Sequence, residues 1–323
     1  MFEVEPNLWL QALATPWLTA LMLGVSKLGH EWFYVVVIVA LGFGARLRPT
    51  LGVLLAVLLA GIATDAAKLG FELPRPSDVD ARVLDDLQER RALVEDGGAQ
   101  HFFELPRAEA RMALRAKDTP DYGFVSGHVS AATAMCLALL WFFRVRRTAL
   151  VALLCAWPLL MVLSRMYLGR HFLADVLGGL AVGAAAAGVA AWLVPPRASP
   201  ARLWGLMATS LLSCTAAPFT TLLVGTSIGR LAGLALVLVV LEGRGFPDDG
   251  GTAWQRIARI GCAFACYWLV DGFAERVGQL AGWTPSSAAW IPVAAFATAA
   301  VFLGAVAMGY ALRLYRPVRE CPA

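Results

Sequence analysis

Residues 122–143 read YGFVSGHVSAATAMCLALLWFF. The apolar run that ends this stretch is typical of a membrane helix, and we expect a span over 124–143. A serine, a glycine and a histidine, Ser126 to His128, stand side by side where that span begins. Polar groups are costly where a chain enters lipid, so this stretch predicts a helix with a chemical role at its N-terminal end.

The whole chain has the composition of a membrane protein. Of its 323 residues, 59% are hydrophobic and only 15% are charged, and the mean hydropathy is +0.66. Soluble globular domains carry about 25% charged residues. Apolar stretches recur along most of the length, so we expect an all-α, polytopic bundle of membrane helices. The acidic start MFEVEPN lacks the basic region of a cleavable signal peptide, and we expect none.

The cysteines argue against a disulfide-rich protein and against a zinc protein, whereas the net charge is uninformative. The six cysteines lie mostly within apolar runs without paired spacing, so we expect small packing residues and neither a disulfide framework nor a zinc site. The net charge of +4 says little about partners, because the two signs are unequally distributed. We expect the bilayer as a partner and no nucleic acid.

The apolar stretches predict nine membrane spans, at about 20 apolar residues for each crossing. They are 31–45, 49–70, 124–143, 148–164, 171–193, 204–225, 228–243, 257–282 and 286–312. The stretch 7–29 is ambiguous because Gln11, Thr15, Thr19 and Lys27 interrupt its apolar pattern. There we favour a helix lying in the membrane interface over a tenth span.

These spans divide the chain into three expected parts. Residues 1–30 form the interfacial helix or extra span, 31–193 form a core, and 194–323 add about four further spans. The core includes an extramembrane loop, 72–121, with twelve acidic and eight basic residues.

Two segments of the loop are typical of short, solvated amphipathic helices. They are VLDDLQERRALVED at 83–96 and RAEARMALRAK at 107–117. A lid over a site is the alternative interpretation.

Arginine placement predicts the orientation of the chain. Connections after alternate spans all carry arginine, which the positive-inside rule assigns to the cytoplasm. These residues are Arg46, Arg48, Arg144, Arg146, Arg147, Arg197, Arg202, Arg244, Arg256, Arg259, Arg313, Arg316 and Arg319. We expect a bacterial inner-membrane protein whose loop 72–121 lies on the outer, periplasmic face and whose C-terminus is cytoplasmic.

Three polar segments at the ends of spans are expected to share one face. They are KLGFELPRP at 68–76, SGH at 126–128 and SRMYLGRHFLAD at 164–175. One extramembrane loop joins the first two, and the chain crosses twice between the second and the third. All three therefore meet on the outer face, whatever the absolute orientation.

The cationic residues of these segments suit a phosphate group. Lys68, Arg75 and Arg165 would place three positive charges at a low-dielectric boundary, which is unfavourable without an anion. Guanidinium groups bind phosphate in a bidentate way, and an ammonium acts as a point charge. Ser126 and Gly127, at a helix N-terminus, add donors where the helix dipole favours negative charge.

The histidines predict phosphoryl transfer. His171 and Asp175 are four residues apart and share a helix face, so the carboxylate can hold the imidazole in one tautomer. His171 then has one free nitrogen for attack, and His128 is a separate acid. Two histidines facing an anion-binding cluster indicate a covalent phosphohistidine intermediate.

Together these segments resemble the type 2 phosphatidic acid phosphatase superfamily of integral-membrane phosphatases, whose relatives include the glucose-6-phosphatases and the vanadium haloperoxidases. The resemblance covers roughly 30–193. Lys68 to Arg75-Pro76 matches the first family block, and Ser164-Arg165, His171 and Asp175 match the third. In the second block Val125 replaces the usual proline, which we interpret as a change in backbone rigidity and not in chemistry.

The resemblance implies a role for each residue. His171 would be the nucleophile, oriented by Asp175, and His128 the acid that protonates the leaving alkoxide. The implied phosphate ligands are Lys68, Arg75, Ser126, Gly127 and Arg165. The family works without a metal, so we expect neither metal nor cofactor.

A site at the membrane surface favours a lipid as the leaving group, such as phosphatidate, phosphatidylglycerophosphate, a polyprenyl pyrophosphate or a sphingoid phosphate. A soluble sugar phosphate is an alternative, because the layout is similar to that of the glucose-6-phosphatases, and a lipid phosphotransferase is another. A non-catalytic lipid-binding scaffold would not need both histidines and the aspartate. A transporter is disfavoured because no paired, broken half-helices recur.

Overall fold

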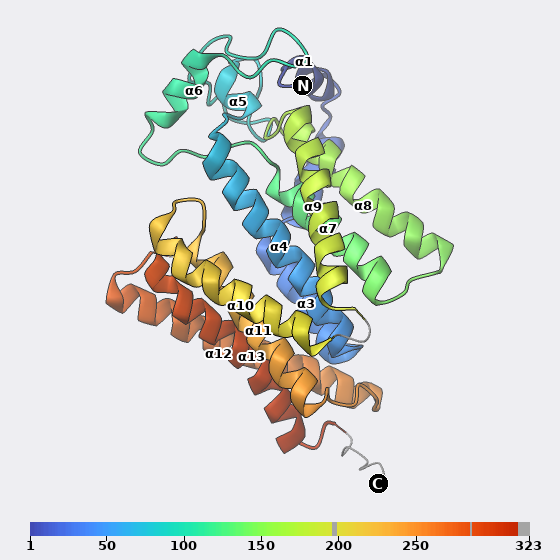
Figure 1. Cartoon of the computed structure of the whole chain (residues 1–323). Helices are drawn as coiled ribbons and strands as arrows, with labels where there is room; N and C mark the ends of the chain where they lie inside the picture. The colour runs from blue at the N-terminus through green and yellow to red at the C-terminus, as the bar shows by residue number, and fades with distance from the viewer. Residues whose placement is uncertain (196–198, 285, 316–323) are drawn as a thin grey trace. The chain divides into compact units, whose positions relative to one another are not determined.

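The computed structural model describes residues 1–195, 199–284 and 286–315. Three arginines used above to orient the chain, Arg197, Arg316 and Arg319, lie outside these residues, as does Cys321. Helices are the regular elements of the described residues, in which paired β-structure amounts to two isolated bridges. The predicted all-α fold class is therefore confirmed (Figure 1).

The chain separates into two compact units that share long helices. Unit 1 comprises Met1–Phe33 and Ala63–Gly188, and unit 2 comprises Tyr34–Ile62 and Val189–Ala323. The units therefore group the chain differently from the expected parts 1–30, 31–193 and 194–323. That division remains a prediction about domains.

Unit 1 contains the helices that carry the predicted site residues. They are α1 (Glu5–Ala12), α2 (Pro16–Lys27), the end of α4 (Leu47–Phe71), α5 (Pro76–Val79), α6 (Ala108–Arg115), α7 (Gly127–Phe142), α8 (Thr148–Tyr167) and most of α9 (Leu173–Leu193). Within 7–29 the chain forms two helices and not one. Pro16 occupies the first turn of α2, where its missing N–H costs nothing.

Unit 2 holds the remaining helices. They are α3 (Glu31–Gly44, whose first residues belong to unit 1), the start of α4, α10 (Pro200–Ala216), α11 (Gly225–Arg244), α12 (Ala253–Ala281) and α13 (Ile291–Ala311), with short 3-10 turns at Ala217–Phe219 and Ala288–Trp290. The guanidinium of Arg259 is buried beside the Tyr315 ring and donates to the carbonyls of Asp248, Asp249 and Gly250. This arginine thereby fixes the connection that precedes α12.

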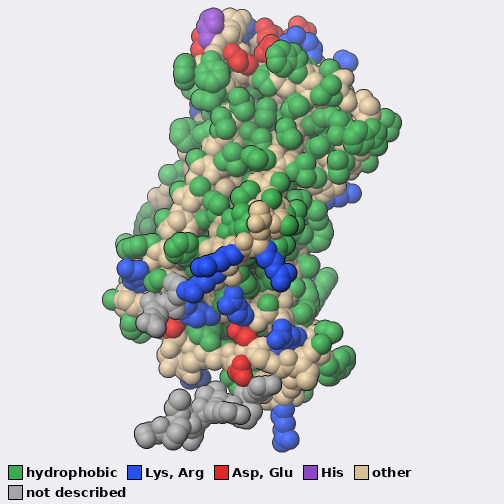
Figure 2. Space-filling view, turned by 90° about the vertical axis from the view of Figure 1, so that its right-hand side faces the viewer, with side chains coloured by type: hydrophobic (Ala, Val, Ile, Leu, Met, Phe, Trp, Pro, Cys, Tyr) green, Lys and Arg blue, Asp and Glu red, His purple; other side chains and the backbone are tan. Residues whose placement is uncertain are grey.

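Within the residues that the structure describes, six segments are long and apolar enough to cross a membrane, so the protein is an integral membrane protein. They are Leu47–Val79, Thr148–Tyr167, Leu173–Leu193, Gly225–Arg244, Ala253–Ala281 and Ala288–Ala311. The pair α2 and α3, bent by 60° at its break, makes a seventh if it is one span. Hydrophobic side chains make up much of the face in Figure 2, as a lipid-facing surface requires.

The count of nine predicted spans is thus higher than the number of helices that meet the length of a crossing. Helices α3, α7 and α10 have 14, 16 and 17 residues. In α7 the reason is local, because Ser126 is extended and the helix begins only at Gly127. Residues 124–126, which the sequence pattern assigns to the span, are therefore not helical, and Ser126 belongs to the predicted site.

Of the two helices predicted in loop 72–121, one is confirmed and the other is wrong. Helix α6 confirms the helix expected within 107–117. No helix forms over 83–96, which contains instead the isolated bridge Asp85–Glu89 and a second one from Asp96 to Asp80. Long-range ion pairs of Asp85 with Arg91 and Arg170 replace the local charge pattern that favoured a helix.

Candidate active site

The N-terminal end of α7 is held by close packing against α9. A Cβ on Gly179 would lie 2.8 Å from the Ser126 carbonyl oxygen, and one on Gly183 would lie 2.4 Å from the Ser130 carbonyl oxygen. The Ser126 backbone N–H donates to the Asp175 carbonyl at 3.0 Å. Only glycine permits this approach of two backbones, which brings the SGH segment beside the start of α9.

A hydrogen bond between hydroxyl groups links α4 to the same place. Thr64 Oγ1 and Ser130 Oγ lie 2.8 Å apart, and Ser130 Oγ also donates to the Gly127 carbonyl at 3.0 Å. Lys68 is one turn beyond Thr64 on α4 and thus on the same helix face. The predicted lysine ligand therefore faces the N-terminal end of α7.

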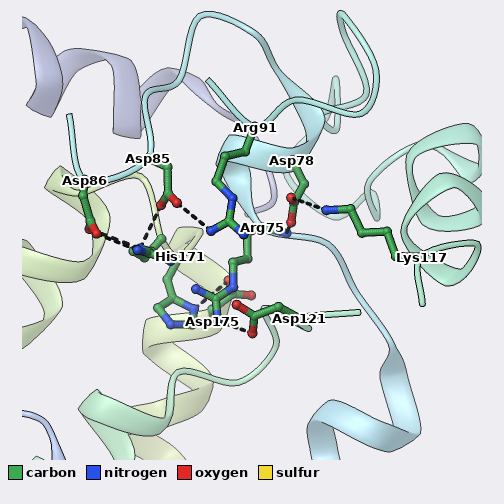
Figure 3. A network of polar contacts seen from close by, with 10 residues as sticks. Arg75, Asp78, Asp85, Asp86, Arg91, Lys117, Asp121, His171 and Asp175 are labelled. Atoms are coloured by element: carbon green, nitrogen blue, oxygen red, sulfur yellow. Dashed lines mark hydrogen bonds and ion pairs between the residues drawn. The ribbon is translucent and has the colours of Figure 1, made fainter. Parts of the chain in front are cut away.

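His171 and Asp175 form a buried pair at the corner between α8 and α9 (Figure 3). Nδ1 of His171 lies 3.3 Å from Oδ2 of Asp175, and the Phe172 backbone N–H donates to that same oxygen at 2.9 Å. The two side chains are 2% and 0% exposed. The carboxylate thus fixes the imidazole with Nε2 as the nitrogen left for chemistry.

Asn7 of α1 supports this corner. Its Nδ2 donates to the Met166 carbonyl at 2.8 Å and to the His171 carbonyl at 3.0 Å, and the residue is fully buried. The N-terminal segment is therefore part of the frame that positions His171. The sequence motifs gave no signal for this residue.

Two buried arginines lie at the same site. Arg75 pairs with Asp121 at 2.5 Å, and Arg165 donates to the Ser26 hydroxyl at 2.6 Å. Both are less than 10% exposed, and the Nε of each is buried without a hydrogen-bond partner among the described residues. A buried guanidinium N–H without a partner is costly unless a ligand accepts from it.

Two further predicted site residues show the same feature. Ser126 Oγ and His128 Nε2 are also buried without a partner among the described residues. Together with the two arginine Nε atoms they make four donor-capable atoms that belong to predicted phosphate ligands or to the predicted acid. This arrangement can bind an anion with several oxygen acceptors.

The electrostatic surroundings of His171 favour its neutral form. His171 precedes α9 and lies outside the membrane-spanning helices. Burial lowers the pKa of its imidazole well below the ordinary value, and the charges of Arg165, Arg75 and Lys68 lower that pKa further. A neutral imidazole has the free lone pair that a nucleophile needs.

The structure therefore brings the eight predicted site residues into one region of unit 1, while their chemical roles remain predictions. Among the described residues, no three His, Cys, Asp or Glu side chains are arranged to hold a metal ion. Sequence reasoning missed Asn7, Ser26 and Asp121, which contact site residues from outside the motifs. The sequence offers only a weak signal for them: Asn7 and Ser26 are polar residues in a largely apolar stretch, and Asp121 lies in the extramembrane loop.

Ion pairs fasten loop 72–121 to the residues just before His171 (Figure 3). Arg170 contacts Asp86 through two hydrogen bonds of 3.1 and 2.5 Å and pairs with Asp85 at 2.8 Å. The Asp86 backbone N–H also donates to the Leu168 carbonyl. Burial raises the pKa of Asp86, but the hydrogen bond and the charge of Arg170 outweigh it and hold that pKa below the ordinary value.

Asp86→Asn should therefore lower the free energy of unfolding by about 0.5–1 kcal/mol at neutral pH. A carboxyl whose pKa is lower in the folded protein stabilises the fold above about pH 4 and loses this effect as the pH falls through the folded value. Thermal unfolding from pH 7 to pH 3 measures the difference, which should shrink toward acid. The exposed Asp118→Asn serves as a control and should follow the wild type. A constant difference at all pH values would contradict the ion-pair explanation.

Comparison with known proteins adds three findings. Residues 49–199 match the model of the PAP2 superfamily. The dihydrosphingosine 1-phosphate phosphatase YSR3 of Saccharomyces cerevisiae is 31% identical over 111 residues, which is 30% of this chain and 27% of the yeast protein. The crystal structure of LpxE from Aquifex aeolicus superposes with a TM-score of 0.44 and 19% identity, over 59% of this chain and 94% of that one. The alignment thus spans about a quarter of the yeast relative.

Proposed function

We propose that this chain is a membrane phosphatase of the PAP2 superfamily, whose model matches residues 49–199, and that it hydrolyses a phosphomonoester or pyrophosphate of a lipid. The observation that carries this proposal is the set of buried, unpartnered donors beside His171. Arg75, Arg165 and Ser126 each have one such atom. A phosphoryl group offers the three acceptor oxygens that would satisfy them.

The proposed reaction has two steps. In the first, Nε2 of His171 attacks phosphorus, the P–O bond to the lipid breaks, and His128 gives its proton to the leaving alkoxide. Asp175 holds Nδ1–H and stabilises the cationic phosphohistidine. In the second, water attacks the phosphohistidine, His128 takes a proton from that water, and inorganic phosphate leaves. The cationic ligands stabilise the charge that develops on the equatorial oxygens.

Two considerations support a lipid substrate. Three of the helices that carry site residues, α4, α8 and α9, are long and apolar enough to span the membrane, so a substrate anchored in the bilayer would reach the site by lateral diffusion. The yeast relative is a dihydrosphingosine 1-phosphate phosphatase by its name. We propose a sphingoid phosphate or another single-phosphate lipid, with the site on the periplasmic face of a bacterial inner membrane and the C-terminus in the cytoplasm.

Purified protein should release phosphate from dihydrosphingosine 1-phosphate or phosphatidate with undiminished rate in the presence of a chelator. The reason is that the proposed ligands of the phosphate are side chains of this protein. Vanadate should inhibit, since it adopts the five-coordinate geometry of the transition state. Malachite-green assays over a panel that adds phosphatidylglycerophosphate, undecaprenyl pyrophosphate and glucose 6-phosphate measure this.

Two outcomes would contradict the proposal. Loss of activity in chelator with recovery on adding Mg²⁺ would reject the proposed mechanism. Turnover of glucose 6-phosphate alone would reject the lipid substrate and favour the sugar-phosphate alternative.

A further inference from the structure

A histidine outside the three motifs lies against His128. The ring centroids of His30 and His128 are 5.0 Å apart with an interplanar angle of 79°, an edge-to-face contact. His30 follows α2, in the break between α2 and α3, and its side chain is exposed. It lies outside the matched residues 49–199. One face of the predicted acid is therefore covered by a second titratable ring that reaches solvent.

The backbone beside His30 is packed firmly onto the same ring. A Cβ on Gly29 would lie 2.3 Å from Cδ2 and 2.9 Å from Cγ of His128. The turn is held by hydrogen bonds from the backbone N–H groups of Gly29 and His30 to the carbonyls of Ser26 and Lys27. The segment 29–30 thus leaves the His128 ring little freedom to tilt, and this restraint is independent of any titration.

The charges that act on His128 come from several elements. They are Arg165 of α8, Lys68 of α4, Arg75 after α4, His171 before α9, and His30. The first three are cationic side chains that also act on His171. Of the two histidines, His171 is buried and His30 is exposed.

We propose that His30 is a positioning residue that holds the ring of His128 and sets the pH at which His128 keeps its proton. This inference rests on the proposed function, because it assigns the acid role to His128. A positive charge at residue 30 disfavours the imidazolium form of His128, and a neutral side chain does not. With the screening of bulk water, which surrounds an exposed side chain, a charge at about 5 Å has an effect of about 0.5–1 pH unit.

The test compares two exposed substitutions of opposite electrostatic effect, His30→Arg and His30→Gln. A general acid must be protonated to act, so activity falls as the pH rises through its pKa. The alkaline limb of the kcat/KM profile for dihydrosphingosine 1-phosphate should lie about 0.5–1 pH unit lower in His30→Arg than in His30→Gln. Lys27→Gln removes an exposed charge one residue from the packed turn and should leave the limb in place. Equal limbs in the two His30 variants would overturn the proposal.

A second measurement does not depend on turnover. The chain has four histidines, so ¹⁵N-histidine NMR in detergent micelles gives four ring signals that single substitutions can assign. The titration midpoint of His128 should be lower in His30→Arg than in His30→Gln. An unchanged midpoint would overturn the inference even if the enzyme is active. A shifted midpoint without lipid phosphatase activity in the wild type would support the contact and reject the proposed function.

Discussion

Replacing His171 with alanine should reduce phosphate release by about 10³-fold or more and abolish the trapping of a phosphoenzyme. The reason is that Nε2 of His171 is the atom proposed to form the bond to phosphorus, and no other imidazole shares its orienting carboxylate. Removing a nucleophile leaves only the stabilisation that the remaining groups provide. Incubation with ³²P-labelled lipid phosphate, quenched with detergent at alkaline pH because phosphohistidine is labile in acid and followed by gel electrophoresis under alkaline conditions, detects the phosphohistidine.

The matched control is His101→Ala. His101 is an exposed histidine of loop 72–121, and its hydrogen bonds with the other described residues are made by its backbone. This variant should keep wild-type turnover and wild-type labelling. Labelled protein in His171→Ala would assign the covalent intermediate to another residue and would reject the mechanism.

Replacing Arg165 with lysine should reduce kcat/KM by about 10²-fold although the positive charge is kept. Arg165 uses one guanidinium nitrogen for the Ser26 hydroxyl and has its buried Nε available for a ligand. A lysine has a single ammonium that cannot reach both positions with the same geometry. The loss should include weaker inhibition by vanadate, which reports on the anion site without turnover.

Two further variants separate the ligand role from a folding defect. Arg82→Lys changes an exposed arginine of loop 72–121 and should leave kcat/KM unchanged. Ser26→Ala should lower kcat/KM less than Arg165→Lys does, because it removes only the support of the guanidinium. If Arg165→Lys retained full activity at an unchanged thermal midpoint, Arg165 would not be a phosphate ligand.

The sequence was sufficient to predict those parts of the site that depend on the order of the helices along the chain. Counting crossings predicts that Lys68, Ser126 and His171 share one face, and all three residues lie in unit 1. This works because a membrane helix has only two ends, so the number of crossings determines which polar ends can meet. The spacing of His171 and Asp175 likewise predicts their contact, since four residues make one helical turn.

Contacts that depend on packing could not be predicted in this way. Asn7, Ser26 and His30 come from a segment whose apolar pattern is ambiguous, and nothing in the sequence indicates which residues of α8 or of the corner before α9 they approach. In the segment 83–96 the sequence does give a local signal, but that signal predicts the wrong structure. Its local charges favour a helix, but long-range pairing of Asp85 and Asp86 with Arg170 decides its conformation. Local periodicity contains no information about such partners.

The glycine contacts between α7 and α9 have a consequence for mutational tolerance. Gly179 lies about one turn beyond Asp175, and Gly183 about two turns. A methyl group at Gly183 would have to displace the backbone of α7 at Ser130, and a rigid helix would pass that shift along its axis to Gly127. A deep mutational scan should therefore show a stripe of intolerance running down α9 into the hydrocarbon layer. In this protein, the positions that are sensitive to substitution would therefore include packing glycines of α9 as well as the catalytic residues.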